Sequence, residues 1–236
     1  MPVRHHPPRH SSGSLAGGLL LFVVASAAWG AGLDALSSKD TSSGLRAALG
    51  QGIDRAIAQL GAPDGFLKNP KFTIPLPPAL EKADRALRMV GMGGDADELK
   101  TAMNHAAESA MGEAKPVFKQ ALQRMTVNDA KGILTGGDEA ATQYFRQSTS
   151  EQLAAKFKPI VARATARAKL APLYDKYAGQ ASQFGLVSSK DANLNDYVTT
   201  KALDGLFGAI ADEERAIRKD PVGQASSIIR KVFGAL

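Results

Sequence analysis

Apolar residues at a near-constant spacing of four dominate the chain from Ser42 onward. The first such segment is "SSGLRAALGQGIDRAIAQLG", whose regularly spaced apolar positions are Leu45, Leu49, Ile53, Ile57 and Leu60. Because an α-helix turns once in about 3.6 residues, this spacing puts these side chains on one face. Segments of the same kind follow to the C-terminus. The pattern predicts a mainly α protein, a single-domain multi-helix bundle.

Capping residues, glycines and prolines divide this pattern into separate helices. We expect helices over residues 42–61, 79–91, 95–112, 113–125, 127–134, 138–146, 151–185, 194–220 and 220–236. Thr126 with Asp129 resembles a capping box, Ser148 with Glu151 resembles another, and Asp95 is a candidate N-cap. Pro159 and Pro172 are expected to kink or divide the longest helix.

A proline-rich stretch interrupts the helices early in the chain. Five prolines lie between Pro63 and Pro78, a density that excludes a long helix. Near residues 70–76, the segment "KFTIPL" predicts either a short extended piece or one arm of a small β-hairpin. Pro75 would keep such a strand at an edge.

The first thirty residues differ from the rest. They carry Arg4 and Arg9 without any acid, then the short apolar run "LAGGLLLFVVASAAWG" with small residues near its end. This order predicts a cleavable secretory signal peptide over 1–30, with a retained anchor as the alternative. Residues 31–236 would form a single helical domain, periplasmic or otherwise exported, with no membrane span after removal of the signal. Cleavage is expected between Ala27 and Ala31.

The residue inventory excludes several chemistries. The chain has no cysteine, which rules out disulfides, thiol nucleophiles and a lipid-modified cysteine anchor. Three of the four histidines lie within 1–30, so zinc sites built from Cys and His are excluded. The remaining His105 lies mid-helix, where we interpret it as a packing or surface residue. We predict no catalytic residue, no metal site and no cofactor.

The segment "KGILTGGDEAATQYFR" (131–146) contains a glycine loop. It is no phosphate loop, because Asp138 and Glu139 stand where a Lys and a Ser or Thr are needed. We predict that Gly136 or Gly137 ends one helix in a left-handed conformation and that Asp138 caps the next. The alternative is a small-ligand or cation site; the candidates in this loop are Thr135, Gly136, Gly137, Asp138, Tyr144 and Arg146.

A second candidate site is the segment "DANLNDYVTTKA" (191–202). It begins with the D-x-N-x-N ligand spacing of an EF-hand loop, but lacks the glycine at position six and the bidentate glutamate at position twelve. A helix start is our first interpretation, and a weak cation site the second. The candidate ligands are Asp191, Asn193, Asn195 and Asp196.

A basic segment, "KFKPIVARATARAK" (156–169), contains no acid. Its cationic residues are Lys156, Lys158, Arg163, Arg167 and Lys169. They form either a solvated face or a surface for anionic headgroups or envelope polymers. Nucleic acid is not expected as a partner, because export argues against contact with genomic DNA. Glu214 and Arg218 form an i,i+4 pair, which we interpret as an ordinary exposed helix pattern without function.

Four motifs resemble one protein family: "NPKFTIPLPPAL", "AKGILTGGDEAATQYFR", "DANLNDYVTTKALDGLF" and "DPVGQASSIIRKVFGAL". They are similar to an exported bacterial family called domain of unknown function 4197, over about Leu33 to Leu236. The resemblance implies a signal-bearing, mainly helical protein, and it carries no catalytic residues over to this chain. Some members look like lipoproteins, from which the absence of cysteine here departs.

These observations favour a non-enzymatic binding or interaction module of the cell envelope. Its partner would be another envelope protein or an apolar small molecule held between helices. The alternative is a carboxylate-dependent hydrolase acting on an envelope polymer, with acids such as Asp138, Asp196 or Glu214 paired across helices.

Overall fold

The computed structural model describes residues 38–91, 93–183 and 194–220, and this part of the chain is helical, without a strand. The elements are α2 (Ser38–Gly61), α3 (Pro78–Met89), α4 (Gly94–Ala110), the short 3₁₀ helix η1 (Met111–Glu113), α5 (Ala114–Arg124), α6 (Val127–Thr135), α7 (Ala140–Arg167), α8 (Leu170–Gln183) and α9 (Leu194–Lys219). The mainly α prediction is confirmed. The predicted boundary at residue 30 lies outside the described residues, and the single domain stays a prediction.

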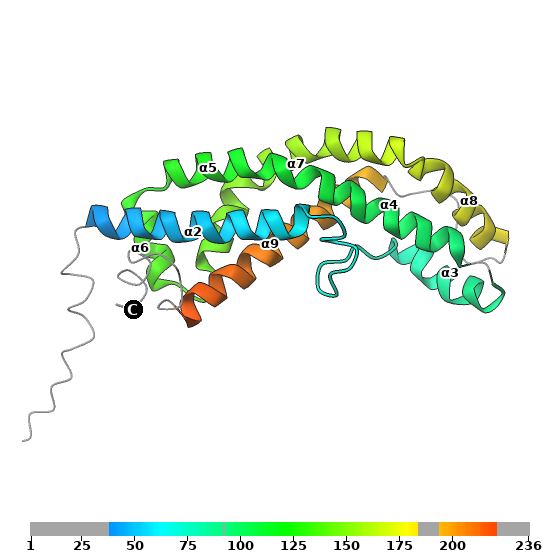
Figure 1. The fold of residues 1–236 in the computed structure, drawn as a ribbon, viewed down its shortest axis with the longest axis horizontal. Helices are drawn as coiled ribbons and strands as arrows, with labels where there is room; N and C mark the ends of the chain where they lie inside the picture. Colours follow the sequence, from blue (N-terminus) through cyan, green and yellow to red (C-terminus); the bar gives the residue numbers. More distant parts are fainter. Residues whose placement is uncertain (1–37, 92, 184–193, 221–236) are drawn as a thin grey trace, which may run out of the picture.

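The helices form an elongated body (Figure 1). At one end α9 packs against α2 and α7, and α5 packs against the same two helices. At the other end α3 and α8 contact each other in a narrower arm. Helix α4 joins the two ends, because it contacts α7 and α9 as well as α8.

The predicted helix faces form the core. The five apolar residues of the first segment lie in α2 and are at most 8% exposed. At the centre, the buried ring of Phe118 on α5 meets Phe145 of α7 and Phe207 of α9 edge to face, with centroids 5.5 and 6.2 Å away. Such pairs add specific geometry to the burial of apolar area.

Some predicted helix starts are confirmed and others are wrong. Thr126 and Asp129 form the predicted capping box at the start of α6. Asp95 is not an N-cap: α4 begins at Gly94, and the Asp95 carboxylate accepts hydrogen bonds from Lys176 and Gln180. Ser148 and Glu151 start no helix, because they lie inside α7.

The longest predicted helix is divided, but not at Pro159. That proline lies inside α7, whereas the break follows at Lys169, a residue with φ of 51°. Pro172 lies in the first turn of α8, where a proline is tolerated. The predicted helix over 220–236 falls almost entirely outside the described residues.

The proline-rich stretch joins α2 to α3 as a series of turns that ends in a run without helix or strand over 73–77. Buried Asn104 of α4 binds it through two hydrogen bonds, accepting from the Ile74 amide at 2.7 Å and donating to the Ile74 carbonyl at 3.0 Å. A side-chain amide therefore takes the place of a neighbouring strand. The extended piece stays a prediction, and the structure forms no strand or hairpin here within the described residues.

The same loop rests on α9 through two phenylalanine rings. A Cβ atom built on Gly205 would lie 2.6 Å from the Phe66 ring, and one on Gly208 would lie 2.8 Å from the Phe72 ring. These two positions require glycine because the rings occupy the space of a side chain. Among the described helices, none combines the length and hydropathy that a membrane crossing requires.

A glycine corner held by a buried ion pair

The glycine loop forms the corner between α6 and α7. Helix α6 ends at Thr135, whose hydroxyl donates to the Lys131 carbonyl, and Gly136 follows with φ −82° and ψ 178°. A Cβ atom on Gly136 would lie 2.6 Å from the Ala140 Cβ and 2.8 Å from the Gly132 carbonyl oxygen. Glycine is required at this position because the two helix ends approach closely. The backbone there is not left-handed.

Two predictions about this corner are wrong. Neither Gly136 nor Gly137 has a positive φ; among the described glycines only Gly91 does. Asp138 does not cap α7 either, since the helix begins at Ala140 and its N-cap residue, Glu139, makes no side-chain cap hydrogen bond. The free amide groups of the first turn must therefore find their acceptor elsewhere.

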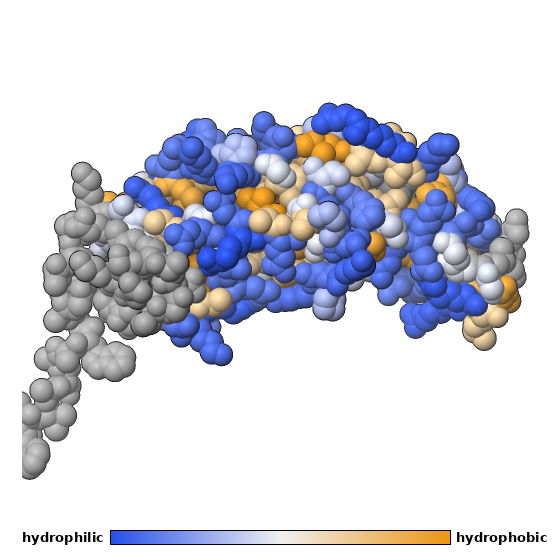
Figure 2. All heavy atoms as spheres, in the orientation of Figure 1, coloured by the Kyte–Doolittle hydropathy of each residue, from blue (hydrophilic) through white to orange (hydrophobic). Residues whose placement is uncertain are grey.

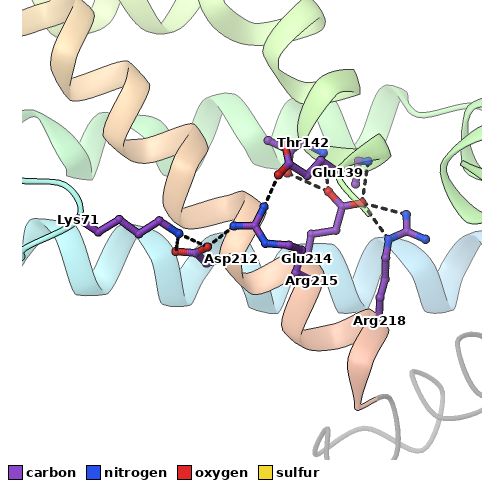
Figure 3. A network of polar contacts seen from close by, with 8 residues as sticks. Lys71, Glu139, Thr142, Asp212, Glu214, Arg215 and Arg218 are labelled. Carbon is purple, nitrogen blue, oxygen red and sulfur yellow. Dashed lines mark hydrogen bonds and ion pairs between the residues drawn. The ribbon is translucent and has the colours of Figure 1, made fainter. Parts of the chain in front are cut away.

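That acceptor comes from α9, seventy residues further along the chain. The carboxylate of Glu214, only 2% exposed, accepts hydrogen bonds from the Ala141 amide at 2.9 Å and from the Thr142 amide and hydroxyl, both at 2.8 Å (Figure 3). A negative charge at this position also matches the positive end of the helix dipole. Glu214 therefore caps α7 as a tertiary contact.

Arg218, one turn later on α9, caps the C-terminal end of α6. Its guanidinium donates to the Glu214 carboxylate at 2.9 and 3.1 Å and to the Ile133 carbonyl at 2.7 Å. That carbonyl belongs to the last turn of α6, whose dipole end is negative. One buried ion pair thus ties together the end of α6, the start of α7 and α9. The prediction that this pair is an ordinary exposed pattern is wrong.

A more exposed chain of charges surrounds the buried pair. Arg215 binds Glu139 and Asp212, and Asp212 also binds Lys71 of the proline-rich loop (Figure 3). Burial opposes ionisation of Asp212, but the hydrogen bonds from Lys71 and Arg215 outweigh it and lower the pKa of this carboxyl. The outer chain connects the corner with the loop.

A groove of about 720 Å³ lies over the corner, a volume typical of ligand sites. Its lining residues are Asn128, Asp129, Gly132, Ile133, Gly136, Gly137, Asp138, Glu139, Ala140, Gln143, Tyr144 and Gln147. Three of them are acids, and none of these described residues is Lys, Arg or His. Asp129 serves the capping box and Glu139 binds Arg215, whereas Asp138 makes no ion pair or hydrogen bond within the described part of the chain.

The structure brings four of the six predicted loop residues together in this groove: Gly136, Gly137, Asp138 and Tyr144. Thr135 does not line it. Arg146 contacts α9 instead, with its guanidinium 4.5 Å from the Phe207 ring centroid and 3.6 Å from the Asp204 carboxylate. Asn128, Gln143 and Gln147 also line the groove and were not predicted. The i,i+4 spacing of the two glutamines from Glu139 onward is the sequence signal that they share a helix face.

The phenol of Tyr144 stands where the two helices meet. Burial raises its pKa, the nearby charge of Asp129 raises it further, and Arg46 acts in the opposite direction. The hydroxyl therefore stays protonated at neutral pH and can donate a hydrogen bond to a ligand in the groove.

The EF-hand-like segment is only partly described: Asp191 and Asn193 lie outside the described residues. Asn195 accepts a hydrogen bond from the Thr165 hydroxyl at 2.7 Å, and Asp196 forms an ion pair with Lys158 at 3.0 Å. Both side chains thus connect α9 to α7. No group of three or more His, Asp or Glu residues suited to a metal occurs in residues 38–91, 93–183 and 194–220.

The basic segment lies on α7 and the turn that follows it. Lys158 is paired with Asp196, and Lys156 lies 3.8 Å from Glu113. Arg163, Arg167 and Lys169 are exposed near the end of α7. His105 is half exposed on α4, with its Nε2 atom 3.2 Å from the Asp64 carboxylate.

The acids named for the hydrolase alternative stand in three different environments. Glu214 is buried with five hydrogen-bond donors around it, Asp196 is paired with Lys158, and Asp138 is exposed at the groove. With its oxygens engaged by these donors, the Glu214 carboxylate has a structural role, as the cap of α7 and the partner of Arg218.

A family model described as "Protein of unknown function (DUF4197)" matches residues 35–234. The chain belongs to the DUF4197 family. No curated protein and no solved structure matches this DUF4197 chain. Three of its four recognised motifs meet in the described part. The Tyr197 hydroxyl of α9 donates to the Pro75 and Leu76 carbonyls of the proline-rich loop, and Arg146, at the end of the glycine-loop motif, contacts Phe207 and Asp204 of α9.

Proposed function

We propose that this DUF4197 chain is a non-enzymatic binding module of the bacterial cell envelope, and that the corner groove holds a cationic segment of a partner protein. The observation that carries the proposal is the lining of the groove: three carboxylates, Asp129, Asp138 and Glu139, without a basic residue among the described lining. An acidic groove favours and orients a positively charged partner.

The polar groups of the groove suit a polypeptide. The amides of Asn128, Gln143 and Gln147 both donate and accept hydrogen bonds, as the backbone of an extended segment requires. The glycines leave the floor free of side chains, so a backbone can approach closely. The walls are preorganised, because Glu214 and Arg218 fix both helix ends.

Filling the groove tests the proposal without disturbing the fold. A Cβ atom on Gly132, inside α6, meets no atom within 4 Å, and leucine is the better helix former by roughly 0.5–1 kcal/mol. Gly132→Leu should therefore keep or raise stability while it closes the groove. Gly179→Leu is the matched control, since Gly179 also lies inside a helix, α8, without an atom within 4 Å.

The probe is a short fluorescein-labelled peptide of alternating lysine and serine, and binding to the full chain is followed by fluorescence anisotropy at low salt. Wild type and Gly179→Leu should bind it, and Asp138→Asn and Gly132→Leu should each bind about tenfold more weakly. The proposal of a cationic partner segment would be refuted if the wild type bound a glutamate–serine peptide as tightly as the lysine–serine peptide. It would also be refuted if Gly132→Leu bound the lysine–serine peptide as tightly as the wild type. Hydrolysis of purified peptidoglycan that depends on Asp138 would support the hydrolase instead.

A further inference from the structure

A second groove, of about 460 Å³, runs between α2 and α5. We call it the α2–α5 seam; its lining residues are Arg46, Gly50, Ile53, Asp54, Lys115, Phe118, Lys119, Leu122 and Gln123. Figure 2 shows orange, hydrophobic surface between these two helices with blue, hydrophilic surface on both sides. The seam is separate from the corner groove and shares no lining residue with it.

The seam has a regular construction. On α5 the residues Lys115, Lys119 and Gln123 follow at i,i+4 spacing and form its polar edge. The two helices run antiparallel along it, because Arg46 donates to the Met125 carbonyl at one end and Asp54 pairs with Lys115 at 3.1 Å at the other. The stretch of α2 between these ends is about 12 Å long.

Gly50 keeps the seam open. A Cβ atom there would lie 3.6 Å from the nearest side-chain atom, Leu122 Cδ1, which is an ordinary contact. By contrast, a Cβ on Gly52 of the same helix would lie 3.3 Å from Glu213 of α9, a tight contact. Packing therefore favours glycine at position 52 but not at position 50, where glycine in a helix interior is unfavourable.

The charges of the seam are positive and incompletely paired. Asp54 is engaged by Lys115, whereas Lys119 has no carboxylate partner in the described part of the chain. The Nε atom of Arg46 is buried and has no hydrogen-bond partner among the described residues. Arg46 and Lys119 thus leave a net positive charge in the seam, and an anionic oxygen is the group that such cations bind best.

From this geometry we propose that the seam binds a medium-chain fatty acid. The alkyl chain lies over Gly50, Ile53, Phe118 and Leu122, and the carboxylate lies between Arg46 and Lys119. Burial of the chain supplies most of the affinity, and the two cations select an acid over an uncharged amphiphile. This site is independent of the corner groove, so either proposal can fail alone.

The test measures displacement of the fluorescent fatty acid dansylaminoundecanoic acid from the full chain by dodecanoate and by dodecanol. Gly50→Leu fills the seam and should weaken the probe and both competitors about tenfold or more, and Gly179→Leu is again the control. Lys119→Glu changes an exposed side chain and should weaken dodecanoate about tenfold while dodecanol is unchanged.

Any of three results would overturn the fatty-acid proposal. The first is that the wild type does not bind the probe. The others are that Gly50→Leu and Gly179→Leu bind the probe equally, or that Lys119→Glu weakens dodecanoate and dodecanol equally. Sedimentation equilibrium measures whether the chain dimerises, which tests a second copy as the alternative occupant of the seam. A dimer that is lost in Gly50→Leu, with no probe binding, would assign the seam to a second copy of the chain.

Discussion

Helix α9 holds the rest of the molecule in two different ways along its length. Its middle holds the proline-rich loop by shape, since Gly205 and Gly208 leave the space that the rings of Phe66 and Phe72 fill. Its C-terminal end holds the α6–α7 corner by charge, through the buried carboxylate of Glu214.

The difference teaches which changes each contact tolerates. A contact made by shape fails when an atom is added, because the core is already close-packed. A contact made by charge fails when a charged group is removed, because its partners stay buried without compensation. The proline-rich loop and the glycine corner both contact α9. Adding an atom at the first contact and removing a charge at the second therefore test their roles separately.

The largest effect is expected at the buried pair. Glu214→Ala leaves Arg218 and the first amides of α7 without their acceptor, which should lower the free energy of unfolding by about 3–5 kcal/mol. Asp212→Ala, two residues earlier with a side chain 38% exposed, is the control and should cost less than about 1 kcal/mol. Urea unfolding followed by circular dichroism measures both. If the two variants lost similar free energy of unfolding, the buried pair would be no more important for stability than the exposed charges around it.

A smaller loss is expected where the shape contact is tightest. Gly205→Ala places a methyl group 2.6 Å from the fully buried ring of Phe66, and overpacking of this kind costs about 1–3 kcal/mol. Gly208→Ala should cost less, because the ring of Phe72 is only partly buried and can move. Thermal unfolding of both variants beside Gly179→Ala, which should gain up to about 1 kcal/mol, checks the order. A Gly205→Ala variant as stable as Gly179→Ala would contradict the shape contact.

The fold was predictable where local signals decide it. The apolar spacing of four placed α2 and its buried face correctly, and the Thr126–Asp129 pair placed the start of α6. The errors share one cause. Asp95 and Ser148 are plausible caps by residue type, but tertiary partners or a continuing helix decided their roles.

The site was predictable in its location and not in its construction. The glycine loop pointed to the corner because turn residues gather there. Nothing local indicated that Glu214 caps α7, since that contact joins residues more than seventy positions apart. The glycines misled in the same way: Gly136 is required by the approach of Ala140, which only the packed structure reveals.

The smallest predicted effect is on the pH dependence of stability, which a charge contact changes and a shape contact does not. The pKa of Asp212 is lowered from 3.8, so the unfolded state takes up a proton first as the pH falls. Asp212 therefore adds stability above about pH 4 and loses this contribution as the pH falls through its lowered folded value. Asp212→Asn should reduce the acid dependence of stability slightly, by less than about 1 kcal/mol, because the group is partly exposed. Gly205→Ala should shift stability equally at pH 7 and pH 3, since no charge is involved. Urea unfolding at the two pH values tests this, and an acid dependence that Asp212→Asn leaves unchanged would remove Asp212 from the charges that hold the corner.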